Sequence, residues 1–309
     1  MKKRVQYIIG GSTAALVTAG LVWLGGNNRF DVLNAQGPVA AQQRDLMLIV
    51  VLLMLVVVIP VFVFTFHIAW KYRAGNSKAA YTPDWDSNRK LEAIWWSIPS
   101  AIILVLGIII WNSSHSLDPY RPIASTQTPV RVQVVALQWK WLFIYPELGV
   151  ASVNHLQVPV GTPINFEITA DAPMNSFWIP QLGGQVYAMS GMATKLHLVA
   201  DKPGNYQGSS ANLSGEGFAN MRFVTAASST QEFDDWVTAV RNNPSQVEVL
   251  DLPLYRQLAQ PGEGKEVNFV VNDGQLFDKV IQKYTQPPET ERHGPEHVQE
   301  HQPSTHSGH

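Results

Sequence analysis

The sequence predicts a membrane-anchored α+β fold: a two-helix transmembrane hairpin, then an antiparallel β-sandwich, then C-terminal helices. Three observations support this fold class. Nearly all long apolar runs lie before Trp111, short stretches of alternating polarity fill the region from Thr128 to about Val224, and helical periodicity returns after Ala227. With 309 residues, the chain has room for one or two domains.

Composition excludes several function classes. The formal net charge is -2 and there is no basic excess, so no nucleic-acid partner is expected. The chain contains no cysteine, which excludes disulfides, thiolate metal sites, cysteine nucleophiles and acylated cysteine.

The first segment, residues 1–26, has a basic start at Lys2–Arg4 and an uncharged apolar run over Val5–Leu24. This order favours a secretory signal. Twenty uncharged residues would also span a bilayer, so a noncleaved anchor is the alternative.

The transmembrane hairpin is predicted over residues 43–112. Its first span, Leu46–Trp70, would be ~37 Å long against a hydrocarbon core of ~30 Å, so we expect tilt or a bend, with Pro60 as the bend point. The second span, Ala93–Trp111, has tryptophans at both ends, as expected at the two membrane interfaces.

The loop between the spans sets the orientation. Its basic residues outnumber Asp84 and Asp86, so the positive-inside rule places this loop in the cytoplasm and everything after Asn112 outside it. The basic residues are Lys71, Arg73, Lys78, Arg89 and Lys90.

The outer domain is expected over residues 125–227. Period-two alternation recurs at Val130–Val134, Ile164–Ile168 and Leu196–Ala200, with Pro and Gly turns between the runs. This spacing predicts an antiparallel sandwich or barrel of about 100 residues.

A helical extension follows over residues 228–286. Ser229 and Glu232 form a capping-box pattern, and further helices are expected around Leu254–Leu258 and Leu276–Tyr284. The sequence leaves open whether these helices pack on the sandwich or on a partner subunit. The tail, residues 287–309, is rich in histidine; such tracts bind divalent metal, although composition favours a disordered, solvated tail.

Three motifs in the outer domain identify a family resemblance. They are Gln138–Trp141, Asn175–Pro180 and the loop Gly208–Met221. Together with the hairpin, they resemble subunit II of the haem-copper oxidases over roughly Gln43–Phe223, and the fold this implies is cupredoxin-like. Trp139–Glu147, Met174–Pro180, Gln185–Gly191 and the helical extension resemble the quinol-oxidising branch, which includes the cytochrome bo-type ubiquinol oxidases.

In copper-containing members of this family, the 208–221 loop would hold a dinuclear copper centre. The resemblance places the ligands, in order, at Asn175, Ser210, Asn212 (backbone carbonyl), Ser214, Phe218 and Met221. Only Met221 keeps a side-chain ligand type, and a single thioether is a weak ligand. We therefore expect no metal here, core packing for Met221, and hydrogen bonds at the two serines. Trp139 matches an electron-entrance tryptophan of the copper proteins, and packing is its expected role here.

The resemblance implies a non-copper subunit of a proton-pumping terminal quinol oxidase in the bacterial inner membrane, with the C-terminal domain in the periplasm. The expected partners are the catalytic subunit I, further membrane subunits and the lipid bilayer, with ubiquinol oxidised by the complex. Haems and copper are expected in the catalytic subunit and no cofactor in this chain, which would act in assembly and stability.

Glu92 adjoins the second span at its cytoplasmic edge. From position alone it is a solvated charge at a helix start. The resemblance matches it to a carboxylate at the mouth of a proton channel of the catalytic subunit, which raises that hypothesis to equal standing.

Two alternative functions differ in class. A copper-containing cytochrome c oxidase subunit II would need the missing cysteines. A membrane-anchored metal-binding or chaperone module would use the histidine-rich tail.

Overall fold

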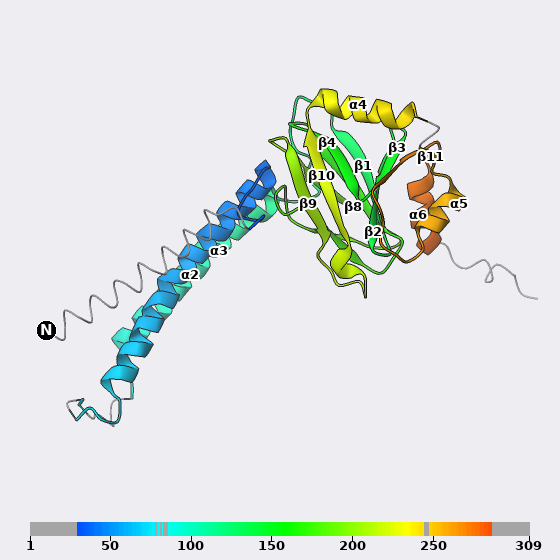
Figure 1. Cartoon of the computed structure of the whole chain (residues 1–309). Coiled ribbons are helices and arrows are strands. Elements are labelled where there is room, and N and C mark those ends of the chain that lie inside the picture. The colour runs from blue at the N-terminus through cyan, green and yellow to red at the C-terminus, as the bar shows by residue number, and fades with distance from the viewer. Residues whose placement is uncertain (1–29, 78, 81, 83–85, 244–246, 286–309) are drawn as a thin grey trace, which may run out of the picture.

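The computed structural model describes residues 30–285, except 78, 81, 83–85 and 244–246. The expected N-terminal segment (1–26) and histidine-rich tail (287–309) lie outside the described residues. The described chain forms a long helical hairpin and a β-domain that sits at one end of it (Figure 1).

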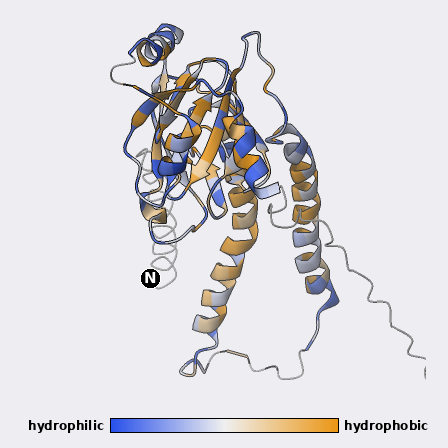
Figure 2. Ribbon diagram, turned by 90° about the vertical axis from the view of Figure 1, so that its right-hand side faces the viewer, coloured by the Kyte–Doolittle hydropathy of each residue, from blue (hydrophilic) through white to orange (hydrophobic). Residues whose placement is uncertain are grey.

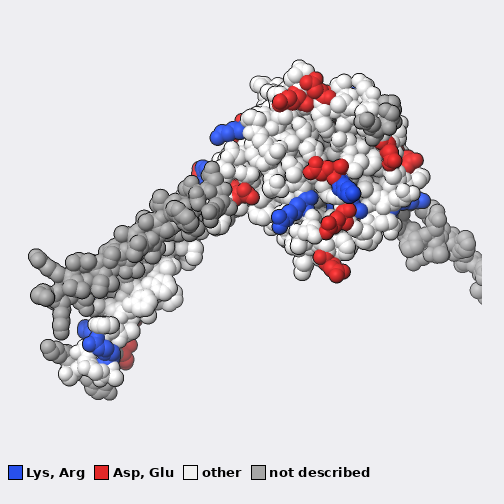
Figure 3. Space-filling view, viewed as in Figure 1, with Lys and Arg blue, Asp and Glu red and all other residues white. Residues whose placement is uncertain are grey.

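The hairpin consists of α2 (Pro38–Lys71) and α3 (Arg89–Ser116). Each helix is longer than its predicted span, because polar turns at the ends continue the helix beyond the apolar run. Pro60 lies within α2, which remains helical on both sides of it. Both helices are long and apolar enough to cross a membrane, and their most apolar windows are unburied. Figure 2 shows apolar residues along both helices. In Figure 3, the part of the hairpin that is not hidden by grey atoms carries no charged residue between its far end and the β-domain.

The β-domain is a sandwich of two sheets. Among the described residues, one sheet has the order β11-β12-β3-β2-β1-β5-β8 and the other β4-β10-β9-β6-β7. The strands are β1 (Val130–Leu137), β2 (Lys140–Tyr145), β3 (Val150–Val153), β4 (His155–Pro159), β5 (Ile164–Ala170), β6 (Asn175–Trp178), β7 (Val186–Ala188), β8 (Thr194–Leu198), β9 (Gly204–Ser210), β10 (Arg222–Ser228), β11 (Glu248–Val249) and β12 (Val267–Val270).

The predicted sandwich is confirmed, but its sheets are mixed. β1 pairs in parallel with β5, from Val130 opposite Ile164 to Ala136 opposite Ala170, and β4 pairs in parallel with β10. Alternating polarity reports which face of a strand is buried, and it is the same for either strand direction. The expectation of purely antiparallel pairing therefore had no basis in the pattern itself.

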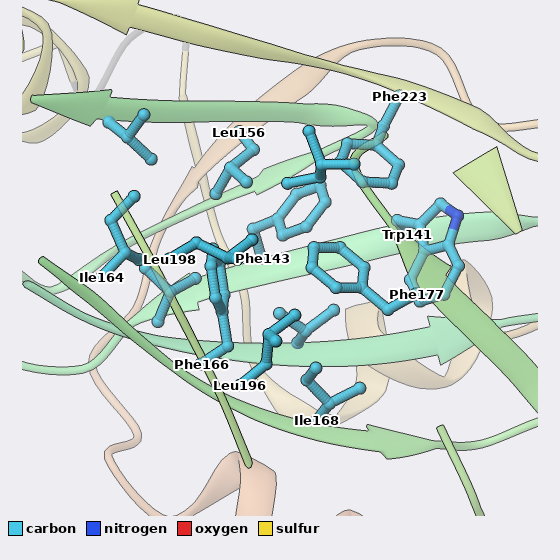
Figure 4. Packing of buried hydrophobic residues seen from close by; sticks show 14 of the residues in the cluster. Trp141, Phe143, Leu156, Ile164, Phe166, Ile168, Phe177, Leu196, Leu198 and Phe223 are labelled. Atoms are coloured by element: carbon cyan, nitrogen blue, oxygen red, sulfur yellow. The ribbon is translucent and has the colours of Figure 1, made fainter. Parts of the chain in front are cut away.

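Aromatic side chains fill the space between the sheets (Figure 4). Phe177 packs against four of them, with ring centroids 5.3 Å from Trp141, 6.2 Å from Phe143, 5.3 Å from Phe166 and 5.1 Å from Phe223. All five side chains are at most 2% exposed.

The C-terminal extension, described here from residue 229 to 285, packs on the sandwich. Its helices are α4 (Thr230–Arg241), α5 (Leu252–Leu258) and α6 (Leu276–Thr285). The predicted capping box is confirmed, because Ser229 and Glu232 exchange both hydrogen bonds. β12 adds to β3, and a second apolar cluster joins the outer face of the large sheet to Tyr255, Phe277 and Val280. The question left open by the sequence is thus answered by packing within the chain.

Backbone hydrogen bonds fix the start of α2 to the β-domain. The Gln36 amide donates to the Gln181 carbonyl (2.7 Å), and the Gln36 carbonyl accepts from the Asp201 amide (2.9 Å). A Cβ at Gly37 would lie 2.3 Å from the Val199 carbonyl oxygen, so only glycine allows this approach. The hairpin and the domain are therefore held together at the membrane end of the sandwich.

Candidate functional site

The 208–221 loop connects β9 to β10 and contains a short 3-10 helix, Phe218–Asn220. Its first residue must be glycine, because a Cβ at Gly208 would lie 2.0 Å from the ring of Phe223. At the other end, the Ser210 amide donates to the Met221 carbonyl (3.1 Å). The loop therefore begins and ends on the packed core.

Hydrogen bonds join this loop to the start of β6 and the residue before it. The Ser210 hydroxyl donates to the Asn175 amide oxygen at 2.9 Å, and the Asn212 side chain donates to the Met174 carbonyl at 2.9 Å. Asn175 in turn donates to the Pro173 carbonyl (2.7 Å) and is 1% exposed. The structure thus brings together Asn175, Ser210 and Asn212, as the family resemblance implies.

Ser214 departs from the expectation that both serines hold hydrogen bonds. Its hydroxyl is buried and has no hydrogen-bond partner within the described part of the chain. The Ser214 carbonyl instead accepts from the indole of Trp139 at 3.2 Å. Trp139 has a positive φ of 68° and lies so close to Gly217 that a Cβ there would sit 2.3 Å from the indole ring. Trp139 therefore packs on the loop, as predicted.

The side chains at the loop do not fit a copper ion. The Ser210 hydroxyl is already directed to Asn175, Phe218 offers a half-buried phenyl ring, and Met221 is fully buried in the core. Neutral hydroxyls and a phenyl ring cannot replace thiolates and an imidazole around copper. No cluster of three or more His, Cys, Asp or Glu side chains that could hold a metal occurs among residues 30–285 as far as they are described.

Asp171 is a buried carboxylate that the sequence did not single out. It follows β5, is 8% exposed, and accepts from Lys283 (2.6 Å), Tyr284 (2.5 Å) and Tyr255 (2.8 Å). Burial opposes its ionisation, but these three hydrogen bonds outweigh burial, so the pKa of Asp171 lies below its ordinary value. The donors lie 84, 112 and 113 residues further along the chain, so no local pattern could have indicated them.

We expect the Asp171 contacts to make stability depend on pH at the acid end. The pKa of Asp171 is lower in the folded than in the unfolded chain, so its stabilisation is present above the unfolded value of about 3.9 and is lost as pH falls through the folded value. Thermal unfolding of the full chain in detergent, from pH 7 to pH 3, measures this. Asp171→Asn should lower the melting temperature at pH 7, and the melting temperature of this variant should fall less steeply below about pH 4 than that of the natural chain. Parallel curves for the two proteins would contradict the prediction.

Glu92 lies at the start of α3, at the far end of the hairpin from the β-domain. Its carboxylate accepts from the Asn88 backbone amide at 3.2 Å, while the Asn88 side chain accepts from the amides of Lys90 and Leu91. Glu92 thus has a structural role in capping this helix.

Comparisons with known proteins place the chain. Residues 146–228 match the family model described as the periplasmic domain of cytochrome c oxidase subunit II. The cytochrome bo(3) ubiquinol oxidase subunit 2 of Pseudomonas putida is 48% identical over 284 residues, which cover 92% of this chain and 88% of that protein. The chain belongs to the ubiquinol oxidase subunit 2 family. The ubiquinol oxidase subunit 2 of Acetobacter aceti is 44% identical, with coverage of 89% and 87%.

Among solved structures, the periplasmic domain of subunit II of the cytochrome oxidase of Bradyrhizobium japonicum matches 37% of this chain and 94% of that domain. Its identity is 24% and its TM-score 0.35. As a ubiquinol oxidase subunit 2, the chain is a membrane-anchored subunit of a multi-subunit haem-copper oxidase, which is an oxidoreductase. The relatives confirm the predicted family and the predicted function as a subunit of a terminal ubiquinol oxidase.

An apolar groove of about 1380 Å³ separates α2 from the 208–221 loop of this ubiquinol oxidase subunit 2. Leu48, Val51 and Leu52 line it on the helix side, and Trp178 and Phe218 line it on the domain side. The helix residues belong to the predicted membrane span. The groove therefore runs from the apolar part of α2 to the 208–221 loop of the β-domain.

Proposed function

We propose that this chain is the non-copper subunit of a proton-pumping terminal quinol oxidase in the bacterial inner membrane, with its β-domain in the periplasm. In this proposal ubiquinol is oxidised by the catalytic subunit I, which also holds the haems and copper and reduces oxygen to water. The observation that supports it is the 208–221 loop, in which Ser210 and Asn212 form hydrogen bonds and Met221 packs in the core, at positions that hold copper ligands in the copper-containing relatives. The chain then acts in assembly and stability.

The exposed apolar surface of the hairpin supports a docking role. Exposed apolar residues cover the hairpin, including Leu52 (63%) and Phe66 (69%), and the groove continues this surface beneath the domain. Such an extent of exposed apolar surface marks contact with lipid or with other membrane proteins. We place subunit I against one side of the hairpin and against the groove, and lipid on the remaining surface.

An affinity tag on the full chain tests this function. Pull-down from membranes should recover a haem-containing catalytic subunit, visible by its absorption spectrum, with ubiquinol oxidase activity. The separately purified full chain should contain no stoichiometric copper and show no near-infrared charge-transfer band. A chain that is recovered without haem, or that itself carries copper, would reject the proposal.

Glu92 provides a prediction about proton uptake. If its carboxylate lies at the channel entrance, then Glu92→Gln, which keeps an acceptor for the Asn88 amide, should slow turnover about threefold, equivalent to ~0.7 kcal/mol of activation free energy. Assembly should be unchanged, and Glu92→Ala should slow turnover at least as much. Quinol-driven oxygen consumption measures the effect.

The matched control for Glu92 is Asn88→Ala, which breaks the helix cap but leaves the carboxylate in place. We expect this variant to retain normal turnover. A different pattern would contradict the prediction. If Glu92→Gln has normal turnover, while Glu92→Ala and Asn88→Ala are both slowed, the role of Glu92 is limited to capping the helix.

The tail separates this function from a metal-binding module. Deleting residues 290–309 should leave oxidase assembly and activity largely unchanged. Loss of function on this deletion would favour the metal-binding or chaperone alternative.

A further inference from the structure

The C-terminal extension contacts the 208–221 loop, and the segments beside it, at several points. The family match to the periplasmic domain ends at residue 228, so α4, α5 and α6 all lie beyond the part of the domain shared with that family model. These elements nevertheless contact the segments on which the loop rests. The contacts fall into three groups.

The first contact is the Asp171 cluster. Lys283 and Tyr284, at the end of α6, and Tyr255, in α5, all donate to this one carboxylate. Four residues later, Asn175 accepts from Ser210, and between them the Met174 carbonyl accepts from Asn212. Two helices of the extension therefore fix the segment that holds the beginning of the loop.

The second contact runs through Lys140 and Trp139. Lys140 is 6% exposed, and its ammonium donates to the carbonyls of Leu258 and Gln260, each at 3.0 Å, at the end of α5. Cations are favoured at helix C-termini. Its neighbour Trp139 packs on Gly217 and donates to the Ser214 carbonyl. The extension thereby also supports the middle of the loop.

The third contact is direct. The Asn220 side chain, near the end of the loop, donates to the Glu263 carboxylate at 2.6 Å. Close by, Gly264 accepts from Asn154 at 2.8 Å, and a Cβ at Gly264 would lie 2.9 Å from Lys140 and from Asn154. The chain before β12 is thus pressed against the sheet beside the loop.

We propose that the C-terminal extension holds the 171–175 segment and the 208–221 loop together, in place of a metal ion. The side chains at the metal positions do not fit copper, and the chain has no cysteine for a disulfide. A single hydrogen bond between two segments adds little net stability, because it replaces hydrogen bonds to water in the unfolded chain. Anchoring both segments to packed helices reduces the freedom with which they separate.

The alternative is that the extension stabilises only itself and the outer face of the large sheet, where its apolar residues pack. The two possibilities differ in where flexibility appears when a contact is cut. If the extension holds the loop, a change in α6 should increase the flexibility of the 208–221 loop. Self-contained packing predicts that it loosens only the extension.

Hydrogen exchange on the full chain in detergent distinguishes them. Lys283→Met removes the ammonium that binds Asp171 and keeps most of the side-chain bulk. We expect amide exchange in residues 171–178 and 208–221 to rise about tenfold, through more frequent local opening.

Lys279→Met is the matched control. Lys279 lies on the same helix and also forms a 2.6 Å ion pair, but its partner, Asp273, belongs to the extension itself. This control should leave exchange in the loop unchanged. A rise confined to residues 276–285 in both variants would overturn the proposal.

Asn220→Ala tests the direct contact without touching α6, should Lys283→Met fail to fold. Asn220 is exposed, so the variant is expected to fold normally. Exchange should rise in residues 214–221 and stay unchanged in 276–285. Wild-type exchange in the loop of this variant would equally overturn the proposal.

Discussion

A chain carrying Asn175→His, Ser210→Cys, Ser214→Cys and Phe218→His is expected to bind copper as a dinuclear centre with a near-infrared charge-transfer band. The backbone already brings Asn175, Ser210 and Asn212 into contact, and Met221 is in place at the end of the loop. Ser210→Cys also removes the 3.3 Å hydrogen bond to the Asn212 carbonyl, which the resemblance assigns as a donor. Thiolates and imidazoles then supply the soft ligand set that copper prefers.

The control for this variant is its histidine half. Asn175→His with Phe218→His, without the cysteines, should bind no stoichiometric copper and show no such band, because two imidazoles and a thioether lack the bridging thiolates. Copper content by elemental analysis and absorption spectra of the full chain measure both outcomes. If the fourfold variant folds yet takes up no copper, the loop has lost the geometry as well as the ligands.

The same variant bears on the role of the C-terminal extension. If the extension and a metal are alternative ways of holding the loop, Lys283→Met should raise exchange in the loop less in the copper-loaded variant than in the natural chain. The two changes are then coupled rather than additive, which is the sign of a shared structural effect.

The sequence was informative wherever a physical rule acts over a short stretch of chain. The capping box at Ser229 and Glu232 and the two long apolar helices are local patterns, and each appears in the structure. The helix bounds were harder to predict, because hydrophobicity marks only the apolar run, whereas α2 already begins at Pro38 in more polar sequence. The short strands β11 and β12 were missed, since two and four residues are too few to show alternation.

The candidate site divides in the same way. Family resemblance located Asn175 and Ser210, but no pattern indicated that Ser214 would be buried without a hydrogen-bond partner in the described chain. Asp171 and Lys140 act through partners more than 80 residues away. Contacts at that separation exist only once the fold has formed, so no local pattern in a single sequence indicates them.

The largest loss of stability is expected from Phe177→Ala. This side chain is fully buried, and its ring packs against those of Trp141, Phe143, Phe166 and Phe223. Truncating a buried phenylalanine typically costs about 3–5 kcal/mol, a large share of the ~5–15 kcal/mol that stabilises a domain. Phe177 also lies opposite Ser210 in the register of β6 and β9, so the cavity left by the truncation would form next to the 208–221 loop.

Phe218→Ala is the matched control, because it removes the same side chain from a half-buried position in the loop. Denaturant unfolding of the full chain in detergent, followed by tryptophan fluorescence, should show a loss of at most about 1 kcal/mol for Phe218→Ala, since only partly buried apolar surface is removed. Phe177→Ala should in addition reduce the amount of haem recovered with the chain, because a loosened sandwich presents a less ordered docking surface. Equal losses for the two variants would mean that the aromatic cluster does not stabilise the domain in the way its packing indicates.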